Sequence, residues 1–131
     1  RAYERGEPIL AYNWEPNWVI GLLDMTLLEE PTYNAKQWND NYGTAYPASK
    51  VQVFVNRDFP SKAPRAAGLL ANYTTTLEQT NEFLAYMKEE NASAEDAAVW
   101  FLANNQETWE AWIIDQDVIK KVHEALKREL K

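Results

Sequence analysis

The sequence predicts an α/β fold in which short strands come first and several helices follow. Residues 7–14 form a short apolar run that is bounded by Gly-Glu-Pro and Glu-Pro. Residues 50–56 alternate with a period of two, which is the pattern of a strand. In the second half of the chain, apolar residues recur at helical spacing instead. These three observations predict strands in the first half and helices in the second.

The first half is predicted to contain three extended segments and one short helix. The length and flanks of residues 7–14 suit a strand that is buried on both faces. Pro16 fits the first turn of a helix, so residues 16–23 are expected to form a short helix. Residues 25–31 predict a second extended segment, and residues 50–56 give the clearest strand of the chain.

Residues 32–47 separate the second and third extended segments. They are rich in Asn, Tyr and Gly and show no periodicity, which predicts a loop. Binding residues are disproportionately found on loops that a rigid scaffold holds in place. This segment is therefore a candidate binding loop.

The second half is predicted to form three or four helices. Pro64 suits a helix start, because proline is tolerated in the first turn. Thr75 and Glu78 have the spacing of a capping box, and Ser93 and Asp96 repeat that spacing. The last apolar stretch ends in lysine and arginine, which suit the negative C-terminal end of a helix dipole.

Six tryptophans are many for a chain of 131 residues. Trp100, Trp109 and Trp112 lie at helical spacing, and aromatic residues in that pattern are expected to pack in a core. Trp14 and Trp18 are different, because they flank a proline directly after a predicted strand. Ligands of open α/β sheets lie beyond the carboxyl ends of strands, so a Trp14 ring could face a cleft.

Composition excludes several classes of function. The length suits one domain, and 46% hydrophobic with 25% charged residues is ordinary for a folded protein. The net charge of -7 would repel a polyanion, so nucleic acid is not expected as a partner. The absence of cysteine excludes disulfides and thiolate chemistry.

Enzyme chemistry finds little support in the sequence. The single histidine, His123, is flanked by lysines and glutamate and is expected to be solvated. Asp115 and Asp117 are expected to cap a helix rather than bind metal, and residues 39–43 lack the spacing of a calcium loop. There is no nucleophile elbow or glycine-rich phosphate loop. No catalytic residue, metal or cofactor is predicted.

Three stretches carry a resemblance to a known family. Residues 3–31 contain a basic-Gly-x-Pro strand that ends in aromatic-x-Trp-x-Pro-x-Trp, residues 46–76 contain a strand, a turn and a Pro-led helix, and residues 91–113 contain Ala-Ala-x-Trp and a final Trp. Together they resemble the glycine betaine, proline betaine and choline substrate-binding proteins of bacterial ABC importers.

The resemblance implies a partial type II periplasmic-binding-protein (Venus-flytrap) fold. Residues 1–131 would form the C-terminal part of a solute-binding domain, a fragment of a longer two-lobed protein that is about twice this length or more. The implied ligand is a small quaternary ammonium osmolyte, and the implied partner is an ABC transporter permease. The protein would be periplasmic or extracytoplasmic and would capture its ligand without catalysis.

The resemblance also implies which residues meet the ligand. By the motif match, Trp14 supplies one aromatic wall of the cation site, and Tyr12, Asn13 and Trp18 belong to the same candidate site. Trp18 is expected to pack under the motif. Glu15 and Asn17 stand where the family often has Thr and then His or Tyr, and an acidic Glu15 could favour a cation without a carboxylate.

Two other classes of function stay open. One is a tryptophan-lined module that binds sugar or peptide. The other is a structural domain that forms a homodimer through its edge, because two or three strands are too few to cover several helices. The orientation of Trp14 distinguishes them from the transporter hypothesis: a ring among other aromatic rings at a cleft supports a ligand site, and a buried ring supports packing.

Overall fold

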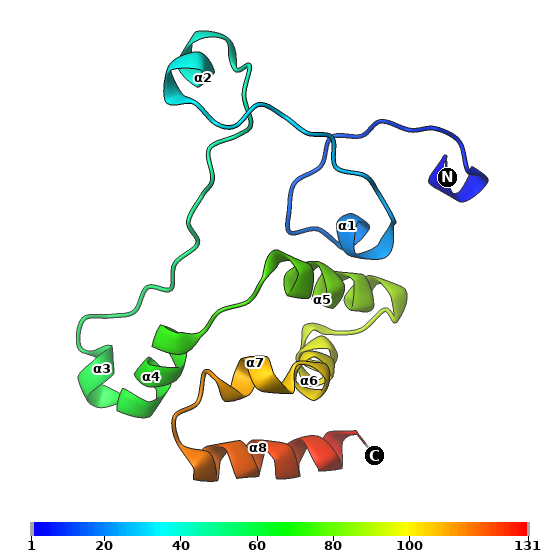
Figure 1. The fold of residues 1–131 in the computed structure, drawn as a ribbon. Helices are drawn as coiled ribbons and strands as arrows, with labels where there is room; N and C mark the ends of the chain where they lie inside the picture. The colour runs from blue at the N-terminus through cyan, green and yellow to red at the C-terminus, as the bar shows by residue number, and fades with distance from the viewer. Residues whose placement is uncertain (1, 131) are drawn as a thin grey trace.

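The computed structural model describes residues 2–130 and consists of helices joined by long extended segments (Figure 1). None of the helices in this range is both long and apolar enough to cross a membrane. The elements in chain order are the 3-10 helix η1 (Tyr3–Arg5) and the α-helices α1 (Trp18–Leu22), α2 (Ala35–Asn41), α3 (Phe59–Lys62), α4 (Pro64–Asn72), α5 (Leu77–Glu89), α6 (Ala94–Asn104), α7 (Gln106–Glu110) and α8 (Gln116–Glu129).

The predicted α/β fold with short strands is wrong, because residues 2–130 contain no β-strand. The segments at residues 7–14, 25–31 and 50–56 are non-helical, as expected, but none of them pairs with another. A β-strand is stabilised by backbone hydrogen bonds to a neighbouring strand, and one unpaired extended segment cannot supply these. In Figure 1 the segment between α2 and α3 runs alone along the edge of the molecule.

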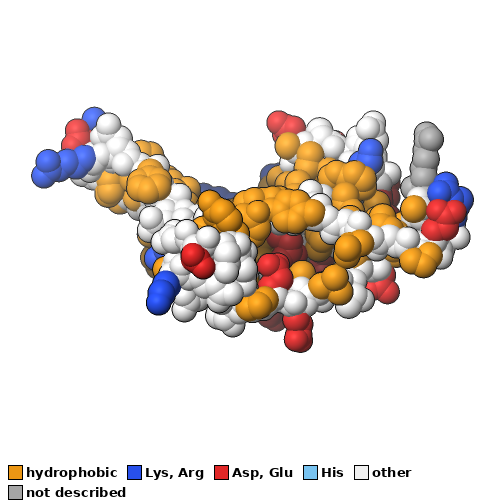
Figure 2. Space-filling view, turned by 90° about the horizontal axis from the view of Figure 1, so that it is seen from above, with side chains coloured by type: hydrophobic (Ala, Val, Ile, Leu, Met, Phe, Trp, Pro, Cys, Tyr) orange, Lys and Arg blue, Asp and Glu red, His pale blue; other side chains and the backbone are white. Residues whose placement is uncertain are grey.

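The unpaired segments leave much of the chain open to solvent. The described surface is 10932 Å² for a chain of 15.2 kDa, whereas a folded monomer of this mass exposes about 7,100 Å². Leu10, Leu27, Val51 and Phe54 are each more than 80% exposed. Hydrophobic side chains lie open across the face seen in Figure 2. A homodimer through this surface stays a prediction, which light scattering would test.

The core lies entirely among the helices of the second half. It consists of the buried side chains of Phe101, Trp109, Trp112, Ile119 and Leu126. The indole N–H of Trp109 donates to the Leu102 carbonyl at 2.7 Å, and that of Trp112 donates to the Thr74 carbonyl at 3.1 Å. Packing is thereby confirmed for both tryptophans. Trp100 also packs against this core and stacks on Tyr86 of α5.

Capping boxes mark the first residues of α5 and α6. Ser93 and Asp96 form the predicted capping box at α6. At α5 the box lies one residue later than predicted, since Thr76 and not Thr75 caps the helix, with Gln79 as its partner. Thr76 accepts the Gln79 backbone N–H at 3.1 Å, and the Gln79 side chain accepts the Thr76 N–H at 3.1 Å. Two adjacent threonines made the start ambiguous in the sequence.

α1 is short and lies against α5. It begins at Trp18, two residues later than Pro16 predicted, because the Asn17 side chain caps it by accepting the Val19 N–H at 2.9 Å. Gly21 faces α5 so closely that a Cβ atom there would lie 2.6 Å from the Asn81 carbonyl carbon. Only a residue without a side chain allows this approach, so Gly21 sets the distance between α1 and α5.

We expect Gly21→Ala to lower the free energy of unfolding by about 1–3 kcal/mol, because the added methyl group collides with backbone that cannot move aside cheaply. Gly68→Ala is the matched control. Nothing lies within 4 Å of a Cβ at Gly68, and alanine is favoured over glycine inside a helix by about 0.5–1 kcal/mol. Urea denaturation should therefore show opposite signs for the two variants, and equal losses would contradict the tight α1–α5 contact.

Candidate functional site

Six aromatic side chains gather where the end of segment 7–14 meets the loop that contains α2. Their neighbouring ring centroids lie 4.8–6.3 Å apart. We call them the aromatic cluster: Tyr12, Trp14, Tyr33, Trp38, Tyr42 and Tyr46. The cluster joins the motif that carried the family resemblance to the predicted binding loop at residues 32–47.

Tyr46 stands between two tryptophans at the centre of the cluster. Its ring centroid is 5.2 Å from that of Trp14 and 4.8 Å from that of Trp38, with interplanar angles of 57° and 60°. Tyr12 meets the edge of Trp14 at 6.2 Å and 90°. The rings are therefore tilted and not stacked flat on one another, and Trp14 and Tyr46 remain 61% and 52% exposed.

Trp14 is an exposed residue and does not belong to the core. Its side chain is 61% exposed, and its ring contacts are with Tyr12 and Tyr46. The core is formed by other residues, on α6, α7, α8 and the turn that follows α7. A large aromatic ring that remains open beside other rings gains nothing from core packing, so the arrangement suits contact with a ligand or partner.

The loop that carries most of the cluster is closed on itself. The Ala45 N–H donates to the Pro31 carbonyl at 2.8 Å, and the Gln37 side chain donates to the Gly43 carbonyl at 3.1 Å. Thr44, which lies inside this closed loop, is buried at 4% exposed. The prediction of a structureless loop is wrong in part, because α2 forms inside it. The missed signal was Asn34, whose side chain caps α2 by accepting the Gln37 N–H.

The sequence prediction named Tyr12, Asn13, Trp14 and Trp18, and the structure brings only some of these together. Asn13 does not belong to the aromatic surface of the site. Its role is a hydrogen bond, since its Oδ1 accepts the backbone N–H of Trp14 at 3.0 Å. Trp18 lies on α1, where the Lys88 ammonium of α5 is 5.3 Å from its ring centroid. An internal cation therefore already covers one face of Trp18.

The cluster contains four residues that the sequence prediction missed as site residues: Tyr33, Trp38, Tyr42 and Tyr46. All four lie within the predicted binding loop, but a loop without periodicity does not show which of its side chains join the cluster. A hydrogen bond with Tyr46 is the main reason that the pKa of Tyr12 is raised above its usual value.

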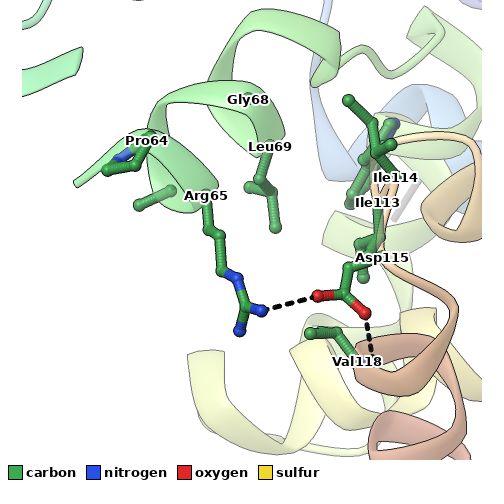
Figure 3. Close-up of a pocket in the computed structure, with 10 residues that line it drawn as sticks. Pro64, Arg65, Gly68, Leu69, Ile113, Ile114, Asp115 and Val118 are labelled. Atoms are coloured by element: carbon green, nitrogen blue, oxygen red, sulfur yellow. Dashed lines mark hydrogen bonds and ion pairs between the residues drawn. The ribbon is translucent and has the colours of Figure 1, made fainter. Parts of the chain in front are cut away.

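Open grooves also lie against the helices of the second half, away from the aromatic cluster. One, of about 450 Å³, runs between α4 and the turn that precedes α8, and Arg65 and Asp115 form an ion pair of 3.0 Å at its rim (Figure 3). Asp115 caps α8 through the backbone N–H groups of Asp117 and Val118, as predicted. Another groove is lined by apolar and aromatic side chains, among them Trp109, Trp112 and Val53 of the extended segment before α3.

Neither groove resembles the aromatic cluster as a cation site. The Trp112 ring is already covered by Tyr73 at 4.7 Å and by Phe101 at 6.1 Å. Both residues are buried, at 8% exposed for Trp112 and 1% for Trp109, so these two tryptophans serve the core.

His123 is not the freely solvated residue that the sequence predicted. Its Nε2 atom lies 2.7 Å from a carboxylate oxygen of Glu110, and its ring centroid lies 4.9 Å from that of Trp109. Hydrogen bonds from Gln106 and then from His123 lower the pKa of Glu110. The correction follows from the turn between α7 and α8, which brings the two helices side by side. The pair joins these helices and shows no nucleophile or metal ligand set.

Comparison with known proteins places the chain in a family. A model of the substrate binding domain of the ABC-type glycine betaine transport system matches residues 1–104. The chain belongs to this family. The match covers the whole aromatic cluster together with α1 and α5. It confirms the resemblance drawn from the tryptophan motif.

Curated relatives of the chain match at modest identity. The trimethylamine N-oxide-binding protein of Pelagibacter ubique is 27% identical over 82% of this chain and 35% of its own length. The glycine betaine/carnitine transport binding protein of Listeria monocytogenes is 24% identical over 99% of this chain and 41% of its own. The glycine betaine/proline betaine-binding periplasmic protein of Escherichia coli is 27% identical over 85% and 38%.

The chain therefore spans between 35% and 41% of the length of these relatives. No solved structure matches the chain. The sequence comparisons therefore establish the family. They do not establish the geometry of the candidate site, which is that of the aromatic cluster in this structure.

Proposed function

We propose that the chain is part of the substrate-binding component of an ABC importer and that its aromatic cluster holds the N-methylated nitrogen of a small osmolyte. The observation that carries this proposal is the arrangement of Trp14, Tyr46 and Trp38, three neighbouring rings from two separate segments. Tyr12 adds a fourth ring beside Trp14. Asn13 accepts the backbone N–H of Trp14, and the ring of Trp18 on α1 lies under the Lys88 ammonium.

The chemistry of a quaternary ammonium group suits such rings. A fully methylated nitrogen has no N–H to donate, so hydrogen-bond acceptors cannot recognise it. Its positive charge is spread over methyl groups, which shed water cheaply and meet the negative face of an aromatic ring. Each well-placed ring contributes on the order of 0.5–2 kcal/mol, with the larger value where water is excluded. Several rings together would supply most of the affinity.

The names of the relatives support the same ligand chemistry. By their names, one relative binds trimethylamine N-oxide, one is a glycine betaine/carnitine transport binding protein, and one binds glycine betaine/proline betaine. These compounds share a nitrogen that carries methyl groups and no hydrogen. We propose the same ligand class for this chain, with glycine betaine, proline betaine or choline as candidates. The protein would work outside the cytoplasm, deliver its ligand to a membrane permease and catalyse no reaction.

A series of compounds that differ in N-methylation tests this proposal. In the full-length gene product, glycine betaine or choline should bind, whereas glycine and ethanolamine should not, because a primary ammonium group keeps strong hydration that rings cannot replace. The preference should persist in high salt, since contact and desolvation are screened little. The measurement is tryptophan fluorescence during titration. An equal response to glycine, or to maltose as a test of the sugar-binding alternative, would contradict the proposal.

A further inference from the structure

Asn81 on α5 is a buried amide whose two ends are both used by the loop after Trp14. The residue is 5% exposed. Its Oδ1 atom accepts the backbone N–H of Asn17 at 2.8 Å, and its Nδ2 atom donates to the Glu15 carboxylate at 3.1 Å. These partners lie 64 and 66 residues away in the sequence. A buried amide with both ends satisfied by one distant loop fixes that loop firmly, because an unmet polar group there would be costly.

A second set of hydrogen bonds extends this attachment to Trp14 itself. The Asn17 side chain donates through Nδ2 to Oδ1 of Asn13 at 3.1 Å. The same Oδ1 atom accepts the backbone N–H of Trp14 at 3.0 Å. The residues on both sides of Trp14 are therefore fixed. Glu15 is hydrogen-bonded to Asn81 directly, and Asn13 is connected to Asn81 through Asn17.

The α1–α5 contact makes this attachment rigid. Gly21 lies against the backbone of Asn81 and against the Ala85 side chain. One helical turn further along α5, Lys88 covers the ring of Trp18. The loop from Asn13 to Trp18 can therefore not shift along α5 without breaking several contacts at once.

We propose that Asn81 is a positioning residue for ligand binding, which fixes the Trp14 ring in the aromatic cluster before a ligand arrives. This inference rests on the proposed function, in which Trp14 is a wall of the cation site. A ring that is already in place binds without the entropic cost of being ordered. Asn81 itself, buried against the loop, makes no contact with the ligand.

The test uses Asn81→Asp in the full-length gene product labelled with 5-fluorotryptophan. Aspartate keeps an acceptor for the Asn17 N–H, but it replaces the donor to Glu15 by a second carboxylate oxygen, and like charges at this distance repel. We expect the fluorine resonance of Trp14, assigned by its loss in Trp14→Phe, to shift or broaden without ligand. The affinity for glycine betaine should fall by roughly three- to thirtyfold.

A rescue and a control separate positioning from stability. Glu15→Gln added to Asn81→Asp supplies an amide that can donate to the aspartate, and it should restore both the resonance and the affinity. The control is Gln79→Ala on the same helix, which removes side-chain hydrogen bonds to Asn105 and Thr108. It should lower the melting temperature and leave the Trp14 resonance unchanged.

The Trp14 resonance and the melting temperature together distinguish a positioning role of Asn81 from a structural one. A Trp14 resonance that is unchanged in Asn81→Asp, with a lower melting temperature as in Gln79→Ala, would make Asn81 merely structural and overturn the inference. If Asn81→Asp does not fold, Asn13→Ala cuts the second attachment on the exposed surface and should move the same resonance, and an unchanged resonance there would also overturn it. If the wild type does not bind glycine betaine, the proposed function fails, while the resonance still tests the positioning role.

Discussion

Replacing Trp109 by alanine is expected to lower the free energy of unfolding by about 3–5 kcal/mol, as large-to-small changes at buried aromatic residues do. The side chain is 1% exposed and lies at the centre of the core of α6, α7 and α8. Its loss leaves a cavity and also leaves the Leu102 carbonyl without the indole donor at 2.7 Å. Urea denaturation followed by far-ultraviolet circular dichroism would measure the change.

Trp14→Ala is the matched control for the loss of stability expected of Trp109→Ala. Trp14 is 61% exposed, and exposed substitutions outside special contacts usually change stability by about 0.5 kcal/mol or less. Trp14→Ala should therefore unfold close to the wild type. Comparable losses for Trp109→Ala and Trp14→Ala would contradict the assignment of one tryptophan to the core and the other to the site.

Trp14→Ala is expected to weaken ligand binding instead. In the full-length gene product, its affinity for glycine betaine should fall by about 1–3 kcal/mol, or roughly 5- to 150-fold in Kd. The reason is the loss of one ring face and of the apolar area that the ligand would cover. Isothermal titration calorimetry would measure the difference.

Trp14→Tyr distinguishes a ring contact from a general disturbance of the loop. Tyrosine keeps an aromatic face at this position, so most of the affinity should remain. Undiminished binding by Trp14→Ala would remove Trp14 from the site. Equal losses in Trp14→Ala and Trp14→Tyr would show that the loop, and not the ring, determines the affinity.

The helical half could be predicted from the sequence because its signals are local. Pro64 begins α4, and Ser93 with Asp96 caps α6, since these residues act on backbone groups within one turn. The periodic tryptophans also indicated the core. Where two candidates adjoin, as at Thr75 and Thr76, the sequence could not choose the cap.

The strands could not be predicted correctly, because a strand depends on a partner far away in the sequence. Val51, Val53 and Val55 alternate as a strand should, but alternation indicates only that one face suits burial. In the described residues nothing pairs with them, and they stay between 46% and 94% exposed. The expected fold class failed at this point, although the family assignment held.

The candidate site was predictable only in part, for a similar reason. The tryptophan motif indicated Trp14 through the residues beside it. Tyr46 lies between Trp14 and Trp38 in a loop that closes between Pro31 and Ala45, and no local pattern predicts these contacts. The link from Asn81 to Glu15 likewise spans 66 residues. Contacts of this kind need a folded structure.

The most direct test of the central claim is the nuclear Overhauser effect between the N-methyl protons of bound glycine betaine and aromatic protons of the full-length gene product. Such effects report proton pairs in close contact, so they locate the methyl groups without mutation. The aromatic cluster predicts cross-peaks to the rings of Trp14, Tyr46 and Trp38. Cross-peaks that come from the rings of Trp109 and Trp112 instead, with none from Trp14, would contradict it.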